Sequence, residues 1–171
     1  GALIAQYEAR GGRTGAVRGT THLSVIDRRG NVASMTASNG SGSGEFVADT
    51  GVQLNNMMGE EDLHPAGFEA ALAGERIPSM MAPTVLRPKE TSMALGSGGS
   101  ERIRSTITQV AAELMIGRHD PRDAVLRPRM HWDGAALQVE PGLPGAVMAS
   151  LEASHPVVRW NHTDLYFGGL H

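Results

Sequence analysis

The chain has 171 residues, of which 40% are hydrophobic, and a formal net charge of −3. This length is enough for one domain with a sizeable core. The slightly acidic balance gives no electrostatic reason to expect nucleic acid or an anionic membrane as a partner. The lack of cysteine excludes disulfides and thiol catalysis. No apolar run approaches the roughly 18 residues that a membrane-spanning helix needs.

The chain begins with a segment that we expect to lead into the first strand. Residues 2–10 could form a short helix. Residues 11–15 (GGRTG) are typical of a flexible tether, because glycine and small polar residues leave the backbone free.

The segment that starts at Thr20 alternates apolar and polar side chains, which is the period-two pattern of a strand. Residues 27–31 (DRRGN) then supply turn chemistry, since Gly30 is free to take a positive φ. Residues 32–38 alternate again. The sequence therefore predicts a β-hairpin whose second strand returns beside the first.

The turn fixes the register of this hairpin. If the loop comprises residues 28–30, Asp27 faces Asn31, and the same register places Thr20 opposite Ser38. Directly opposed residues have Cβ atoms about 5 Å apart. We therefore expect the Thr20 hydroxyl to have the Ser38 hydroxyl as a neighbour.

A threonine hydroxyl is a poor nucleophile unless a base takes its proton. One chemical solution uses the free α-amine of the same threonine as that base, as in N-terminal threonine enzymes. For Thr20 this solution requires the Gly19–Thr20 bond to be cut first. The alternative is an ordinary strand threonine with no catalytic role.

The rest of the chain predicts short strands and helices joined by turns. Residues 38–44 (SNGSGSG) form a polar loop that is either a flexible linker or part of a site. Residues 101–116 carry apolar side chains on one face and end before a glycine, as an amphipathic helix does. An Asp-Pro pair at 120–121 favours the start of another helix. We expect strands at 51–56, 83–86, 93–95, 135–140 and 157–160, and a third helix at 143–153.

Four motifs follow one another in the chain: GTTH at 19–22, GVQLNN at 51–56, SMMAPT at 79–84 and GSGGS at 96–100. In this order they resemble the gamma-glutamyltranspeptidases, N-terminal-nucleophile hydrolases made as a precursor that cleaves itself into a large and a small subunit. The resemblance implies an α+β fold of four layers, αββα, of which this chain supplies part.

The same resemblance implies a division of the chain. Residues 1–19 would be the end of the large subunit and a linker. Residues 20–171 would be the small-subunit catalytic region, with a C-terminus that stops short of the family's usual end.

The resemblance also implies catalytic roles. After self-cleavage between Gly19 and Thr20, the Thr20 hydroxyl would attack a γ-glutamyl carbonyl, and water or an amine acceptor would take the acyl group. Ser38 maps onto a family threonine that hydrogen-bonds the nucleophile. The backbone amides of Gly99 and Ser100 map onto the donors that bind the oxyanion, which suits unpaired N–H groups at a helix start. A plain strand-to-helix turn, or a loop that binds a phosphate-type anion, is the alternative for this motif.

Other family positions concern the substrate. Asn39 matches a substrate-binding asparagine in a loop that is shorter here. Glu60 stands near the family's aspartate for the substrate α-amino group, and Ser79 with Met80 stands where two serines hold the α-carboxylate. Met57 replaces a common Gln or Glu. Because methionine cannot pair with a charged group, we expect the recognition of the amino acid to be altered.

The leading hypothesis is thus a gamma-glutamyltranspeptidase-like enzyme that transfers or hydrolyses the acyl group of γ-glutamyl amides of the glutathione type. The second is an amidohydrolase or acylase of the same fold with a non-glutamyl substrate. The third is a non-catalytic fragment with a role in assembly only. Activity of the 171-residue chain alone is not expected, because the Thr20 nitrogen is an amide in it and the large subunit is missing.

We expect the large subunit of the same precursor and a small-molecule amide as partners, and apolar faces left uncovered could also drive homo-oligomerisation. No cofactor is expected. The seven histidines show no close metal-ligand spacing, so no metal site is predicted. Family members are often periplasmic or secreted, and a cytoplasmic location would also fit.

Overall fold

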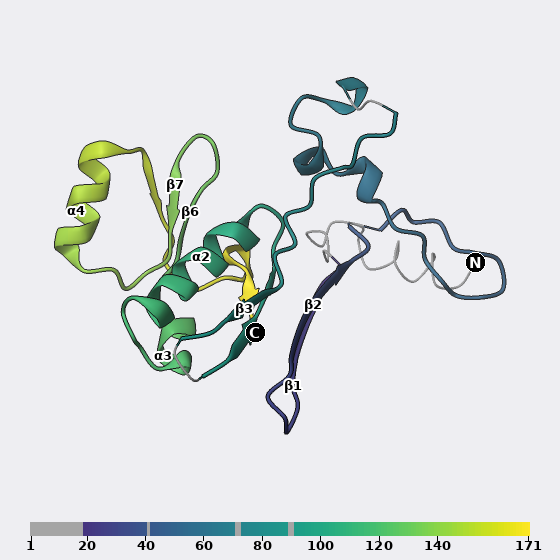
Figure 1. Ribbon diagram of the computed structural model, residues 1–171. Coiled ribbons are helices and arrows are strands. Elements are labelled where there is room, and N and C mark those ends of the chain that lie inside the picture. The colour runs from purple at the N-terminus through teal and green to yellow at the C-terminus, as the bar shows by residue number, and fades with distance from the viewer. Residues whose placement is uncertain (1–18, 41, 71–72, 89–90) are drawn as a thin grey trace.

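The computed structural model describes residues 19–40, 42–70, 73–88 and 91–171 (Figure 1). Within these residues the chain forms both helices and strands, in runs of one to three elements of a kind, so the α+β character is confirmed at this level. The predicted helix at 2–10 and the tether at 11–15 lie outside the described residues. The four-layer arrangement stays a prediction for this chain.

The hairpin forms as predicted. β1 (Thr20–Ile26) and β2 (Val32–Ser38) pair antiparallel, and Thr20 lies opposite Ser38. The turn explains the register, because the Asp27 carboxylate accepts the backbone N–H groups of Arg29 and Asn31 at 2.7 and 2.9 Å. Hydrogen bonds from the Asn31 side chain and then from the turn backbone hold the pKa of the Asp27 carboxyl below its usual range. Figure 1 shows the hairpin as a long, narrow pair of strands that extends away from the helices.

The polar face of the hairpin, not its apolar face, meets the rest of the chain. His22 bonds to Thr36 at 2.8 Å and lies over Gly96, where a Cβ would come within 2.1 Å of the His22 ring. On the other face Leu23 and Met35 are 54% and 55% exposed. Glycine at position 96 therefore lets the hairpin dock closely, while its apolar face stays open.

The other strands form three small sheets. Their pairs are β3 with β4, β5 with β9, and β6 with β7 and β8; only β7 and β8 run parallel. The strands are β3 (Thr84–Leu86), β4 (Met93–Leu95), β5 (Ser97–Gly98), β6 (Met130–Trp132), β7 (Leu137–Val139), β8 (Val157–Arg159) and β9 (Gly169–Leu170). The strands β5, β6 and β9 were not predicted from the sequence, because two or three residues are too few to show an alternating pattern.

The predicted strand at 51–56 is wrong. The structure has only an isolated antiparallel bridge between Phe46 and Gln53 there. Gly51 adopts a φ of +71°, which breaks the extended backbone. The chain continues as three short 3-10 turns, η1 (Met57–Gly59), η2 (Glu61–Leu63) and η3 (Phe68–Ala70).

Three helices follow, α2 (Arg102–Met115), α3 (Pro121–Leu126) and α4 (Gly145–Ser154), and a 3-10 turn, η4 (Leu165–Phe167), precedes β9. The Asp120 side chain caps α3 by accepting the Arg122 N–H, as predicted. The main core forms around the apolar face of α2 and comprises Leu95, Ile103, Ile107, Val110, Leu114 and Ala124. No helix in the described part of the chain is long and apolar enough to cross a membrane.

A buried histidine links α2 to β6. His131 is 6% exposed, and its Nδ1 lies 2.7 Å from the Ser105 hydroxyl. Burial, with a further contribution from the charge of Arg102, lowers the pKa of His131. Burial also lowers the pKa of His22. In the folded protein both imidazoles therefore take up a proton only at a lower pH than a free histidine does.

We expect the protein to lose thermal stability as the pH falls from 7.5 to 5.5. The unfolded chain protonates its histidines near pH 6.5, whereas folded His22 and His131 resist protonation, so protons favour unfolding. Melting curves across this range measure the effect. His131→Gln should flatten the pH dependence, and an unchanged slope in that variant would show that His131 does not cause it.

Candidate active site

Two hydroxyl groups lie close together where β1 starts and β2 ends. Thr20 Oγ1 lies 2.9 Å from Ser38 Oγ. The Asn39 N–H donates to the Gly19 carbonyl at 3.3 Å, which makes Thr20 and Ser38 a non-hydrogen-bonded pair, the kind whose side chains lie closer together. The Gly40 N–H donates to Ser38 Oγ at 3.1 Å. The Ser38 oxygen is thus fixed in place beside the Thr20 hydroxyl.

A glycine segment passes beside Thr20. A Cβ at Gly98 would lie 3.5 Å from the Thr20 Cβ, so β5 is in van der Waals range of that residue. The chain then turns through Gly99 and Ser100, at φ of +123° and +54°, into α2. Within the described part of the chain, the backbone N–H groups of Gly99 and Ser100 have no acceptor. Two free donors therefore precede a helix N-terminus, where the helix dipole favours negative charge.

A network of side chains supports this turn from behind. A Cβ at Gly99 would lie 3.2 Å from the Gly168 Cα. Arg129 donates to the Gly168 carbonyl at 2.8 Å, and Thr106 donates to the Phe167 carbonyl at 2.5 Å. The Arg129 guanidinium is in turn paired with Glu140, which is 3% exposed, at 3.4 Å. These residues fix the segment against which Gly99 packs.

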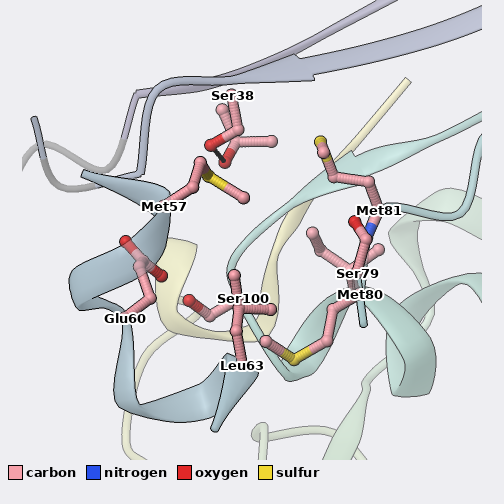
Figure 2. A pocket seen from close by; sticks show the side chains of 10 residues that line it. Ser38, Met57, Glu60, Leu63, Ser79, Met80, Met81 and Ser100 are labelled. Atoms are coloured by element: carbon pink, nitrogen blue, oxygen red, sulfur yellow. Dashed lines mark hydrogen bonds between the residues drawn. The ribbon is translucent and has the colours of Figure 1, made fainter. Parts of the chain in front are cut away.

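One pocket gathers most of the predicted site residues (Figure 2). The cavity that it encloses has a volume of about 30 Å³, far below that of a typical ligand pocket. Figure 2 shows Met57 and Glu60 on one side, Met80 and Met81 on the other, and Ser100 between them. The pocket is lined by Thr20, Ser38, Met57, Glu60, Leu63, Ser79, Met80, Met81, Ser100 and Ile103.

The lining differs from the sequence prediction in several respects. Leu63 and Ile103 join the pocket although no motif includes them, and Met81 joins it from the SMMAPT motif although no role was predicted for it. Asn39 does not line it; its amide oxygen is buried, has no hydrogen-bond partner in the described part of the chain, and lies against Gly19. Gly99 is also absent from the lining. None of the described residues that line the pocket is basic. The Glu60 carboxylate is the only formal charge that these residues place there.

Sequence reasoning also missed Arg129 and Thr106, which hold the Gly168 segment. No local signal marks them, since each is more than 35 residues from its carbonyl partner. The site as a whole presents a pair of hydroxyls, two backbone N–H groups in the turn that leads into α2, and a pocket whose lining is half apolar. A hydroxyl and backbone donors for an oxyanion are two of the parts that acyl transfer through a covalent intermediate uses.

Comparison with known proteins gives the family. The sequence profile of the gamma-glutamyltranspeptidases matches residues 4–171. The chain belongs to the gamma-glutamyltranspeptidase family. It is 35% identical to the Acylase ACY 1 proenzyme of a Pseudomonas species over 92% of this chain, and 32% identical to the glutathione hydrolase proenzyme of Bacillus subtilis over 77% of it.

The structure agrees with this membership. It matches the crystal structure of a mutant gamma-glutamyltranspeptidase of Helicobacter pylori with a TM-score of 0.73 and 29% identity, over 88% of each chain. The gamma-glutamyltranspeptidase region seen here is only part of the curated relatives, however. The chain spans 30% of the length of the acylase proenzyme and 23% of the Bacillus subtilis proenzyme.

Proposed function

We propose that this chain carries the nucleophile of an enzyme that hydrolyses or transfers the acyl group of γ-glutamyl or related amides. The observation that carries the proposal is the 2.9 Å contact between the Thr20 and Ser38 hydroxyls, in a pocket that Ser100 also lines. Membership of the gamma-glutamyltranspeptidase family supports this kind of reaction.

In the proposed reaction, self-cleavage after Gly19 first frees the α-amine of Thr20. This amine takes the proton of Thr20 Oγ1 as the oxygen attacks the amide carbonyl of the substrate. The oxyanion accepts hydrogen bonds from the N–H groups of Gly99 and Ser100. The leaving amine takes the proton as the C–N bond breaks, and water or a second amine then removes the acyl group from Thr20.

The remainder of the precursor would complete the site and the αββα layers. The exposed apolar face of the hairpin supports this, since Leu23, Val25 and Met35 are each about half exposed. An apolar strip of this kind is unusual on a free surface and is typical of an interface. We propose that the large subunit of the same precursor covers this strip. Two relatives of the chain are named proenzymes, which supports this proposal.

A second candidate differs in its substrate. The apolar half of the pocket lining consists of Met57, Leu63, Met80, Met81 and Ile103, and burying a substrate carboxylate against them would be costly. This favours an acylase whose acyl group is less polar than γ-glutamyl. The 35% identity to a protein named acylase supports the same direction.

The test compares p-nitroanilides in the complete protein, one with a γ-glutamyl group and one with a simple acyl group. We expect weak or no activity on glutathione and a much higher KM than that of a typical relative. Met80→Ser should raise kcat/KM on the γ-glutamyl compound about tenfold, because a hydroxyl can bond the carboxylate. Met58→Ser is the matched control, since Met58 is 62% exposed and outside the pocket lining.

Efficient glutathione hydrolysis that is lost in Glu60→Gln would refute the altered specificity, because another geometry would then hold the amino acid. Background rates on both compounds from the complete, processed protein would favour the third hypothesis, a role in assembly only.

A further inference from the structure

Two backbone hydrogen bonds hold Gly19, the residue before the bond that the proposed self-cleavage breaks. The Gly19 N–H donates to the Gly40 carbonyl at 3.1 Å, and the Gly19 carbonyl accepts the Asn39 N–H at 3.3 Å. These two bonds lie on either side of the Gly19 Cα. They give the carbonyl next to Thr20 a fixed direction before any cleavage.

The Asn39 side chain packs directly on Gly19. A Cβ on Gly19 would lie 1.8 Å from Asn39 Oδ1 and 2.9 Å from Asn39 Cγ, far inside van der Waals distance. The same Oδ1 is buried and has no hydrogen-bond partner among the described residues. Only glycine fits position 19 while Asn39 keeps this place.

The donor to the Gly19 carbonyl is separate from the donors proposed for the substrate. Asn39 follows β2, whereas Gly99 and Ser100 precede α2. The two sets belong to elements far apart in the sequence. Variants at one set should therefore affect self-cleavage and turnover differently.

We propose that Asn39 builds the self-cleavage site, resting on the proposed function. Its N–H stabilises the oxyanion that forms on the Gly19 carbonyl when Thr20 Oγ1 attacks, and its side chain restricts position 19 to glycine. The Oγ–C bond forms, the hydroxyl proton ends on the Thr20 nitrogen, and the C–N bond breaks. Water then hydrolyses the ester to a Gly19 carboxylate and a free Thr20 amine.

The first test follows self-cleavage of the freshly made complete protein by intact mass. Gly19→Ala should slow cleavage about a hundredfold, because the new Cβ displaces Asn39 and moves its N–H away from the Gly19 carbonyl, which amounts to the loss of one oxyanion donor. Asn39→Gly removes the side chain but keeps the backbone N–H, so the double variant Gly19→Ala, Asn39→Gly should recover most of the rate. Gly145→Ala is the matched control, since a Cβ there meets nothing within 4 Å.

The second test removes the donor itself. Asn39→Pro lacks the backbone N–H, whereas Asn39→Gly retains it, so only the proline variant should cleave slowly. Melting curves check that both variants fold. Molecules of Gly19→Ala that have been cleaved should turn over substrate at the normal rate, because residue 19 is no longer joined to Thr20.

Cleavage of Gly19→Ala at the normal rate, or failure of the double variant to recover, would overturn the role of the Asn39 side chain. Normal cleavage of Asn39→Pro would overturn the role of its N–H. In all these cases the wild-type protein still cleaves, and the proposed function stands. Absence of cleavage in the wild-type protein would instead refute the proposed self-cleavage, and this inference with it.

Discussion

Replacing Thr20 with alanine in the complete protein is expected to abolish both self-cleavage and turnover. The variant loses the hydroxyl that lies 2.9 Å from Ser38 Oγ, next to the Gly19 carbonyl. Both proposed reactions use this oxygen as nucleophile. Intact mass should show one uncleaved species, and p-nitroanilide hydrolysis should stay at background.

Thr21→Ala is the matched control for this prediction. Thr21 is the next residue of β1, but it is exposed and lies outside the pocket lining. It should retain cleavage and activity close to the wild type. Normal processing of Thr20→Ala would disprove the assignment of the nucleophile.

Gly99→Ala is expected to reduce turnover by roughly two to three orders of magnitude, as loss of an oxyanion donor does. The backbone at Gly99 has a φ of +123°, and a Cβ would lie 3.2 Å from the Gly168 Cα. The turn must shift to make room, and the N–H groups of Gly99 and Ser100 would move with it. The loss should appear in kcat of the processed protein, with KM changed less.

Gly134→Ala separates this effect from backbone strain alone. Gly134 also has a positive φ, +99°, but a Cβ there meets nothing within 4 Å. It should lose some stability and keep its kcat. Ser100→Gly should keep activity too, because the donor is a backbone group that the change leaves in place. A folded Gly99→Ala variant with normal kcat would contradict the proposed oxyanion site.

Structural features that depend on residues close together in the chain could be predicted from the sequence. The hairpin register follows from Asp27, which binds the backbone of its own turn, and from Gly30 at a φ of +81°. The buried face of α2 follows from helical periodicity, and the start of α3 from the Asp120 cap. Each of these rests on interactions within a few residues, which is why pattern and turn chemistry suffice.

The family resemblance predicted site roles for Thr20, Ser38, Ser100, Glu60 and Met80. The structure brings all five to one pocket. Their catalytic and binding roles stay predictions. The geometry adds the contact distances and the apolar half of the lining, which no motif states.

Other features depend on contacts between segments that are distant in the sequence, and these became visible in the tertiary structure. The two-residue strands β5 and β9 exist because they pair with each other across more than 70 residues. The segment 51–56 forms only an isolated bridge to the residues just before it. Arg129 reaches Gly168 behind the turn at Gly99, and Asn39 lies on Gly19 instead of lining the pocket. Contacts of this kind depend on which distant segments the fold places side by side, and a linear pattern of residues does not contain that information.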